Sequence, residues 1–341
     1  MSWPRIGLRQ PSRCFSIARP TSSEKATAPA APGLVGTVSG YPAADRPSSA
    51  VPETPRKYRL RKPKPMLVCS VPACRAPLAI DSVGRRAVCP RGHSYDRAKS
   101  GYWNLLQPQD RRSNAPGDSG HAVRARRLLA DQGLDTPLFA ALVPILGTLD
   151  TADRPAVLDV GCGEGAWLGF LSAQREVDAW GTDLSTPAIE LAARRLLQAT
   201  WVIANADRRL PFADRSFDRI TSLTARRNPE EFARLLAPGG RLVIALPGPD
   251  DLIELREATL GRGDRRERLD GALAEMSPFF EIEGRERVDW TATLDEEGIS
   301  ALLASTYRGG RAGREERAKA LAGKAVSFSR DLGWLKRRTR T

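Results

Sequence analysis

Short apolar runs alternate with amphipathic segments from residue 157 to about residue 260. The apolar runs are rich in β-branched residues and predict strands at 157–160, 178–182, 201–204, 218–223 and 241–246. The segments that follow these runs predict helices near 164–174, 186–198, 230–236 and 249–259. Strands that alternate with helices of this length connect by right-handed crossovers, so the pattern predicts an α/β fold with a parallel sheet.

The C-terminal part of the chain changes this pattern. After a helical segment at 264–276, the stretches 279–291 and 325–332 can supply an antiparallel pair that completes the sheet. Helical spacing also recurs at 295–305 and 313–322. Ligands of such sheets bind outside the carboxyl ends of the strands, which places a binding site at the glycine-rich turn 161–165.

The N-terminal segment has a different character. Residues 1–65 are rich in Pro, Ala, Ser and Arg and lack apolar periodicity, which predicts a disordered basic tail. Its first two dozen residues contain a single acid, Glu24, as in an organellar transit peptide, but three prolines disfavour the amphipathic helix that such a peptide needs. An unstructured tail, or a reading frame that starts at Met66, explains the segment more simply than targeting does.

The rest of the chain divides into three predicted parts. Residues 66–107 form a small module, residues 108–150 form a polar linker followed by two helices, and residues 151–341 form the larger domain. Asp118 and Ser119 precede the first linker helix and offer a capping side chain.

The charge distribution favours a polyanionic partner. The formal net charge is +13, yet residues 128–307 carry more acidic than basic side chains, so the excess of positive charge lies in the flanking segments. Such an asymmetry suits nucleic acid held by the flanks, and the alternative is an ordinary solvated surface with basic tails. No uninterrupted apolar run reaches about 18 residues, which argues against a membrane span.

Three cysteines and a histidine in the small module have the spacing of a structural zinc site. Four residues separate Cys69 from Cys74, three separate Cys89 from His93, and fourteen lie between the two pairs. The chain has five cysteines, an odd total that does not suggest a disulfide framework and fits a reducing compartment better. The alternative is a set of buried free thiols beside a surface histidine.

Basic and aromatic residues surround these four positions. They are Arg85, Arg86, Arg91, Arg97 and Lys99, with Tyr95, Tyr102 and Trp103. Such a set combines charges for phosphates with rings for unstacked bases. The alternative for Tyr95 and Trp103 is that their rings pack the small core of the module.

The turn after the first strand carries the chemistry of the larger domain. Asp159 precedes Gly161, Gly163 and Gly165, at which the backbone can bend sharply and approach a ligand. Asp183 ends the second strand and can accept both hydroxyls of a ribose, as in NAD enzymes and methyltransferases. The pyrophosphate of a dinucleotide is anionic and does not need an acid such as Asp159 beside it. The sulfonium and α-amino group of S-adenosylmethionine are positively charged and do suit an acid at this position.

Further landmarks follow in a fixed order. Asp207 comes after the third strand, where a carboxylate can meet the adenine amino group. Leu210-Pro211-Phe212, Ser216-Phe217-Asp218 and Leu236-Ala237-Pro238-Gly239-Gly240-Arg241-Leu242 come next. This order resembles that of class I S-adenosylmethionine-dependent methyltransferases, whose sheet is Rossmann-like.

Motifs spread over residues 66–255 resemble a narrower family, the RlmA-type 23S rRNA (guanine-N1)-methyltransferases. They include the zinc-site residues, then Tyr95-Asp96, Ala98-Lys99-x-Gly101-Tyr102-x-Asn104-Leu105-Leu106, Pro116-Gly117-Asp118-Ser119, Ala125-Arg126-Arg127, the glycine-rich turn and Pro247-Gly248-Pro249. The resemblance implies a zinc-binding RNA-recognition module in front of a methyltransferase that modifies one hairpin guanine of 23S rRNA. Some members of the family confer macrolide resistance.

The resemblance also implies the site residues. The implied zinc ligands are Cys69, Cys74, Cys89 and His93. The implied contacts to S-adenosylmethionine are Asp159, Gly161, Gly163, Glu164, Gly165, Asp183 and Asp207. Cys162 lies inside the turn and is expected to pack rather than react.

Some positions depart from the family. The loop Thr224-Ala225-Arg226-Arg227-Asn228-Pro229 stands where relatives carry a more apolar loop beside the substrate. Asp135 and Asp251 occupy two positions near the cofactor at which an aromatic residue and an imidazole are expected. These departures leave the methyl donor unaffected and bear on which base is methylated.

The group that removes the N1 proton of guanine is not identified by the sequence. Asp118, Asp207 and Asn228 are candidates, and each also has a structural explanation, as a helix cap, an adenine contact and a turn residue respectively. His121 is expected to be an exposed helix residue.

Three functions are compatible with these observations. The first is a cytoplasmic rRNA guanine-N1 methyltransferase whose zinc module and basic linker helix hold an RNA hairpin. The second is a methyltransferase for another RNA or a small molecule, with the zinc module serving stability or dimerisation. The third is a zinc-dependent RNA-binding protein without turnover. The sequence leaves open whether the chain forms a homodimer.

Overall fold

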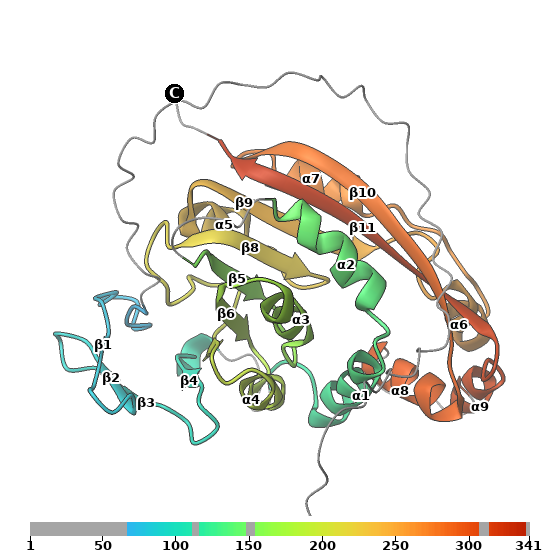
Figure 1. The fold of residues 1–341 in the computed structure, drawn as a ribbon, viewed down its shortest axis with the longest axis horizontal. Helices are drawn as coiled ribbons and strands as arrows, with labels where there is room; N and C mark the ends of the chain where they lie inside the picture. Colours follow the sequence, from blue (N-terminus) through green and yellow to red (C-terminus); the bar gives the residue numbers. More distant parts are fainter. Residues whose placement is uncertain (1–66, 111–115, 148–153, 307–313, 339–341) are drawn as a thin grey trace, which may run out of the picture. The chain divides into compact units, whose positions relative to one another are not determined.

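A mixed sheet forms the centre of the larger domain, with the strand order β10-β11-β9-β8-β5-β6-β7-β4 (Figure 1). The computed structural model describes residues 67–110, 116–147, 154–306 and 314–338. All of them belong to one compact unit, Leu34–Thr341. The expectations for residues 1–65 therefore lie outside the described part of the chain.

Five neighbouring strands form the parallel half of this sheet. They are β5 (Ala156–Val160), β6 (Asp178–Asp183), β7 (Thr200–Ile203), β8 (Phe217–Leu223) and β9 (Leu236–Pro247). The pairs β5–β6, β6–β7, β5–β8 and β8–β9 are all parallel. All five residues of β5 are buried, because helices cover both faces of a parallel sheet, and so this strand shows no polar alternation. The predicted parallel sheet is confirmed.

The antiparallel end consists of β10 (Phe280–Thr293) and β11 (Ala325–Arg337). The two strands pair with each other, and β11 also pairs with β9. The ladder shifts register between Ile282 and Gly284, and a Cβ on Gly284 would lie 2.1 Å from the indole of Trp334. β11 continues beyond the predicted end at residue 332 and pairs with β9 as far as Lys336.

Helices cover the two faces of the sheet (Figure 1). They are α1 (Gly120–Asp131), α2 (Thr136–Ile145), α3 (Ala166–Gln174), α4 (Thr186–Arg195), α5 (Pro229–Leu235), α6 (Ile253–Leu260), α7 (Leu269–Met276), α8 (Glu296–Thr306) and α9 (Arg314–Lys319). Ser119 accepts a hydrogen bond from the Ala122 N–H at the start of α1, as the sequence predicts. Among the described residues, no helix is long and apolar enough to cross a lipid bilayer.

Alternate strand residues face two different apolar cores. Val157 and Ile203 join the core that contains residues of α1 to α4 and α8, whereas Leu158 and Val202 join the core that contains residues of α5 and α7. The second core also contains Leu67, Leu78, Cys69, Cys89, Trp103 and Leu105. The small module therefore shares its interior with one face of the sheet.

The small module, residues 67–107, is built on three short antiparallel strands. They are β1 (Ala79–Ile80), β2 (Arg86–Val88) and β3 (Ser94–Asp96). A fourth strand, β4 (Trp103–Asn104), leaves this sheet and pairs in parallel with β7 at the edge of the large sheet. The short 3-10 helix η1 (Pro108–Asp110) follows.

Two further contacts hold the module to the larger domain. Leu67 forms an isolated bridge with Phe212, and the N–H of Val68 donates to the carbonyl of Pro211 at 2.9 Å. Trp103 is 2% exposed and Tyr102 is 8% exposed. Both rings are packed in the interior, so they do not offer the stacking surface that the basic and aromatic set suggested.

Candidate functional site

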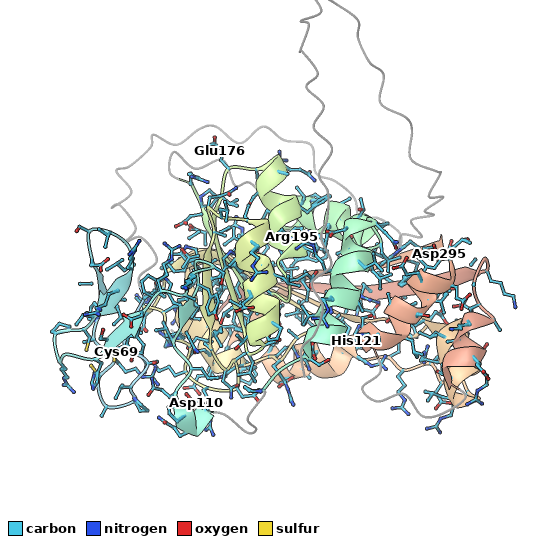
Figure 2. All side chains as sticks on the ribbon, turned by 90° about the horizontal axis from the view of Figure 1, so that it is seen from below. Cys69, Asp110, His121, Glu176, Arg195 and Asp295 are labelled. Carbon is cyan, nitrogen blue, oxygen red and sulfur yellow. The ribbon has the colours of Figure 1, made fainter. Side chains whose placement is uncertain are left out.

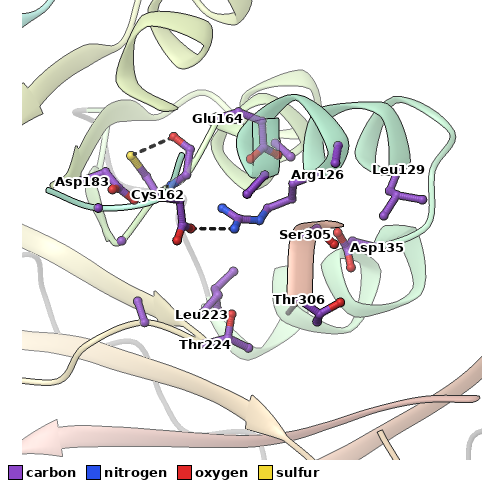
Figure 3. A pocket seen from close by; sticks show the side chains of 18 of the residues that line it. Arg126, Leu129, Asp135, Cys162, Glu164, Asp183, Leu223, Thr224, Ser305 and Thr306 are labelled. Carbon is purple, nitrogen blue, oxygen red and sulfur yellow. Dashed lines mark hydrogen bonds and ion pairs between the residues drawn. The ribbon is translucent and has the colours of Figure 1, made fainter. Parts of the chain in front are cut away.

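A cavity of about 1670 Å³ opens at the carboxyl ends of the parallel strands (Figure 3). Its wall includes the glycine-rich turn after β5, the ends of β6 and β7, the loop after β8, and residues of α1 and α8. The position agrees with the rule for open α/β sheets, in which ligands bind beyond the strand ends. The predicted residues Asp159, Gly161, Gly163, Glu164, Asp183 and Asp207 all line this cavity.

The glycines of the turn meet a conformational and a steric requirement. Gly161, Gly163 and Gly165 have φ values of +79°, +55° and +80°, in the left-handed region that side chains disfavour. A Cβ on Gly161 would lie 2.2 Å from the Cβ of Ala225, and one on Gly165 would lie 2.7 Å from the indole of Trp201. The turn therefore has no room for side chains at two of its three glycines.

The steric requirement predicts the effect of Gly161→Ala. A left-handed alanine costs about 1–2 kcal/mol, and the overlap with Ala225 adds roughly 1–3 kcal/mol. Gly239→Ala is the matched control, because Gly239 has φ +73° and a Cβ added to it would meet no atom within 4 Å. Thermal unfolding should show a larger loss for Gly161→Ala, and calorimetric titration should show weakened cofactor binding for that variant alone. Equal losses in the two variants would contradict the steric explanation.

Asp183 is held in place by the backbone around it. Its Oδ2 accepts from the N–H of Gly163 at 3.0 Å, and its Oδ1 accepts from the N–H of Ser185 at 2.8 Å. Burial raises the pKa of Asp183, and these two donors oppose the increase. Each carboxylate oxygen keeps a lone pair for a further donor. The arrangement suits a ligand with two neighbouring hydroxyls.

Asp159 is 2% exposed at the base of the turn. Its only hydrogen bond among the described side chains is from the hydroxyl of Thr221, at 2.7 Å. Burial raises the pKa of Asp159 to about 7, with Asp183 and Glu164 adding to the increase and Thr221 opposing it. A buried carboxylate without a cationic partner is suited to a ligand that brings positive charge.

Arg126 points from α1 into the cavity rather than outward (Figure 3). Its guanidinium donates to Asp118 at 2.7 Å, and Nη1 lies 3.5 Å from the position that a Cβ on Gly163 would take. Burial lowers the pKa of Arg126, but Asp118, Glu164 and Asp183 together outweigh that effect and raise it. Helical spacing alone does not reveal this orientation, which depends on the tertiary packing of α1.

The linker helix α1 therefore presents less positive charge to a partner than its sequence suggested. Arg126 is paired with Asp118, and Arg127 is paired with Asp131 at 2.6 Å. His121 is exposed on this helix, as predicted (Figure 2). Two of the three arginines of α1 thus form ion pairs within the protein and are not freely presented to a partner.

The other candidates for the proton acceptor differ in position. Asp207 is exposed at the rim of the cavity. Asn228 caps α5 by accepting from the N–H of Glu231, and its amide donates to the carbonyl of Ala206. Asp118 is paired with Arg126. Asn228 thus has a structural role where the chain turns into α5, whereas Asp118 is the ion-pair partner of Arg126 and not the predicted helix cap, which is Ser119. Cys162 is buried in the core, as expected.

Two more acids, Asp135 and Asp251, lie near Arg330, which lines the cavity. The sequence analysis did not predict that Arg330 belongs to the site. Asp251 forms a close ion pair with Arg330 of β11 and accepts from the Ser329 N–H at 3.2 Å. Asp135 lies near both Arg330 and Arg126, and these charges oppose the burial that raises the pKa of Asp135. The two departures from the family pattern, Asp135 and Asp251, thus lie around one guanidinium.

Backbone strain marks the same region. Thr224 and Leu252 have φ values of +56° and +53°, although neither is glycine. Both residues line the cavity. Non-glycine residues in this conformation cost energy and concentrate at functional sites. No feature of the sequence signals either position.

The four predicted zinc ligands converge in the small module. One potential ligand atom from each of Cys69, Cys74, Cys89 and His93 lies within 4.8 Å of all the others. The Nδ1 of His93 is 3.4 Å from Cys69 Sγ and 3.3 Å from Cys89 Sγ, and Cys74 Sγ is 3.6 Å from Cys89 Sγ. Ligands at the corners of a zinc tetrahedron lie about 3.5–3.8 Å apart, so the residues present fit this metal.

Polar neighbours orient the zinc-site residues. The hydroxyl of Tyr95 lies 3.2 Å from Cys69 Sγ and also 3.2 Å from Ser70 Oγ, and Gln107 donates to Ser70 at 2.7 Å. Burial tends to raise the pKa of Cys89, but N–H donors of His93 and Arg91 and its thiol and imidazole neighbours lower it to about 6. A thiolate with outer hydrogen bonds is the form that binds metal.

Two family models match the chain. Residues 68–114 match the N-terminal domain of RlmA, a zinc ribbon, and residues 157–240 match a methyltransferase domain. The first match covers the converged cysteines and histidine, and the second covers the glycine-rich turn together with Asp183 and Asp207.

Similar proteins of known name include two rRNA methyltransferases. The 23S rRNA (guanine(748)-N(1))-methyltransferase of Streptomyces fradiae is 36% identical over 68% of this chain and 82% of its own length. A putative 23S rRNA (guanine-N(1)-)-methyltransferase of Bacillus subtilis is 32% identical over 68% of this chain and 85% of its own. A putative methyltransferase from Bacillus halodurans is 17% identical, with a TM-score of 0.41 over 59% of this chain and 99% of that one.

Proposed function

This chain belongs to the RlmA-type 23S rRNA (guanine-N1)-methyltransferases, and from that premise we propose that it methylates N1 of a guanine in a 23S rRNA hairpin. The observation that carries the proposal is the presence in one chain of the RlmA-type zinc ribbon and a cavity lined by the acids that S-adenosylmethionine requires. The reaction takes place where ribosomes are assembled, in the cytoplasm.

We assign each part of the cofactor to the groups that suit it. Asp183 accepts the ribose hydroxyls, and Asp207 at the rim lies beyond β7 for the adenine amino group. Asp159 provides negative charge for the ammonium and sulfonium, and Gly161, Gly163 and Gly165 let the backbone approach. Glu164 adds negative charge beside the turn. When bound, S-adenosylmethionine supplies an electrophilic methyl group.

The zinc module contributes to the RNA-binding surface in this proposal. Arg85, Arg86, Arg91, Arg97 and Lys99 are exposed on it. Arg75, which follows a zinc-site cysteine, lies against Arg209 of the loop that contains Asp207, and burial together with Arg209 lowers the pKa of Arg75. Neighbouring guanidinium groups that repel each other are stabilised by phosphates. Positive charge therefore leads from the module towards the rim of the cavity.

Methylation of unmodified rRNA tests the proposed function. Purified protein and S-adenosylmethionine are added to 23S rRNA from a strain that lacks the gene, and primer extension then locates the product. N1-methylguanine blocks base pairing, so we expect one new stop at a hairpin guanine. The Asp159→Asn variant, which lacks the charge for the cofactor, should give no stop. Methyl transfer to small metabolites without any stop in rRNA would instead support the small-molecule alternative.

A further inference from the structure

The cavity extends beyond the strands that carry the proposed cofactor-binding residues. The proposed cofactor groups lie on β5 and β6 and after β7, whereas Leu252 follows β9, and Phe328 and Arg330 belong to β11. Ligand pockets are typically about 300–1,000 Å³, and this cavity is larger. In Figure 3, Asp183 lies on one side, and Asp135, with residues of α8, lies on the other. The second side has room for another ligand.

Asp135 directs its carboxylate into this second side. It occupies the N-cap position of α2, yet its side chain makes no capping hydrogen bond. An aspartate at this position normally accepts from the first turn of its helix and stabilises it. Here the carboxylate instead lines the cavity, half-buried, and no hydrogen bond to it is found among the described residues. The carboxylate is therefore available to a ligand in the cavity.

Arg330 is held rigidly beside it. Its Nη1 is committed to Asp251 and to the carbonyl of Ser329, and its guanidinium lies 5.7 Å from the ring centre of Trp290. Within the described part of the chain, its Nη2 and Nε have no hydrogen-bond acceptor. The aromatic ring of Phe328 and the side chain of Leu252 line the cavity nearby. The second side thus offers an acceptor, a fixed cation and apolar surface.

We propose that Asp135 and Arg330 recognise the Watson–Crick edge of the target guanine. This edge presents two adjacent donors, N1–H and the 2-amino group, followed by the O6 acceptor. A carboxylate accepts from both donors, and a guanidinium donates to O6. A base turned out of its stack is read in this way between polar groups and apolar side chains. The inference rests on the proposed function and assigns its substrate-reading residues.

The same contact supplies the missing proton acceptor. The N1–H proton moves to the carboxylate of Asp135, and the N1 lone pair then forms a bond to the methyl carbon. The carbon–sulfur bond breaks, its electron pair stays on sulfur, and S-adenosylhomocysteine is released. Arg330 stabilises the charge that develops on O6 as N1 loses its proton. Burial raises the pKa of Asp135, in the direction that favours proton uptake.

A comparison of guanosine and inosine at the target position tests this assignment. Inosine lacks the 2-amino group, so it removes one of the two hydrogen bonds to Asp135. For wild-type protein, single-turnover methylation of the inosine RNA should be roughly 10-fold slower than that of the guanosine RNA. Asp135→Asn should be slower by about 100-fold on guanosine RNA. The penalty for inosine in this variant should fall to less than about 3-fold.

Two further measurements complete the test. The dissociation constant of S-adenosylmethionine should be unchanged in Asp135→Asn within about 3-fold, and Glu176→Gln, at an exposed position between α3 and β6, should behave as wild type in every assay. An equal inosine penalty in wild type and Asp135→Asn would overturn the inference. So would a loss of cofactor affinity that matches the loss of rate, because it would place Asp135 on the cofactor. No methylation of guanosine RNA by the wild type would overturn the proposed function itself.

Discussion

Asp159→Asn is expected to lose S-adenosylmethionine binding while stabilising the unliganded protein above pH 7. The buried Asp159 carboxylate has no cationic partner among the described residues, so the positively charged ligand provides its compensation. Removing one partner of a buried charge pair costs about 3–5 kcal/mol, and we expect the dissociation constant to rise at least roughly 100-fold. Asparagine keeps the shape and can still accept from Thr221.

The gain in stability follows from the raised pKa. Folding raises the pKa of Asp159 from 3.8 to about 7, so between these values the folded state binds more protons than the unfolded state. The stability of the unliganded protein therefore falls as pH rises through this window and stays reduced above it. Three pKa units correspond to at most about 4 kcal/mol, and removing this penalty should raise the melting temperature by up to roughly 8–16 °C, at about 2–4 °C per kcal/mol for a large domain.

Calorimetric titration and thermal unfolding between pH 5.5 and 8.5 check both effects. Wild-type affinity for S-adenosylmethionine should weaken as pH falls below 7, because the carboxylate becomes protonated. Asp331 is the matched control, since it is equally buried but forms a bidentate ion pair with Arg287 at 2.5 and 3.2 Å. Asp331→Asn should destabilise the protein. A destabilised Asp159→Asn variant, or one that binds the cofactor normally, would contradict the prediction.

Loss of zinc is expected to unfold residues 67–107 and weaken RNA binding. Strands β1 to β3 contain two or three residues each, and Ala87 is the one buried residue among them, so these strands contribute little apolar surface to a fold without metal. Cys89→Ser removes a central ligand and should leave less than one zinc per chain. The affinity for S-adenosylmethionine should change by less than about tenfold, because the turn and Asp183 lie on other strands.

Hydrogen exchange and RNA gel shifts measure this outcome. Exchange should become fast throughout residues 67–107 and should rise at β7, since β7 pairs with β4. Cys162→Ser, at a buried cysteine outside the cluster, should retain its zinc. A Cys89→Ser variant that keeps slow exchange in the module would show that the apolar core, and not the metal, holds it together.

Local patterns in the sequence predicted the parts of this protein that depend on local physics. The alternation of strands and helices reflects hydrophobic periodicity, and the turn from Gly161 to Gly165 requires backbone angles that glycine adopts most readily. The spacing of Cys69, Cys74, Cys89 and His93 predicted that they lie together, and their ligand atoms do converge. These predictions needed no knowledge of how distant segments meet.

The remaining features depend on distant contacts. A Cβ on Gly181 would lie 2.2 Å from the indole of Trp201, which explains this glycine only once β6 and β7 are paired. Arg126 faces the cavity because α1 packs against α4 and α8. Arg330 meets Asp251 because β11 pairs with β9, the strand that precedes Asp251. The C-terminal region, which lies outside the family motifs at 66–255, thus supplies part of the cavity wall.

The short pairing of Trp103 and Asn104 with β7 bears on how such proteins diversify. A module tethered only by a flexible linker can be exchanged between enzymes by recombination within the linker. In this protein, a transferred module would also have to include the edge strand β4 and the apolar residues beneath it. The reason is that β4 pairs with β7 and the N–H of Leu105 donates to the carbonyl of Ile203. Chimaeras joined at the linker should therefore aggregate unless the receiving sheet has a compatible free edge, so the two parts of this chain have to change together.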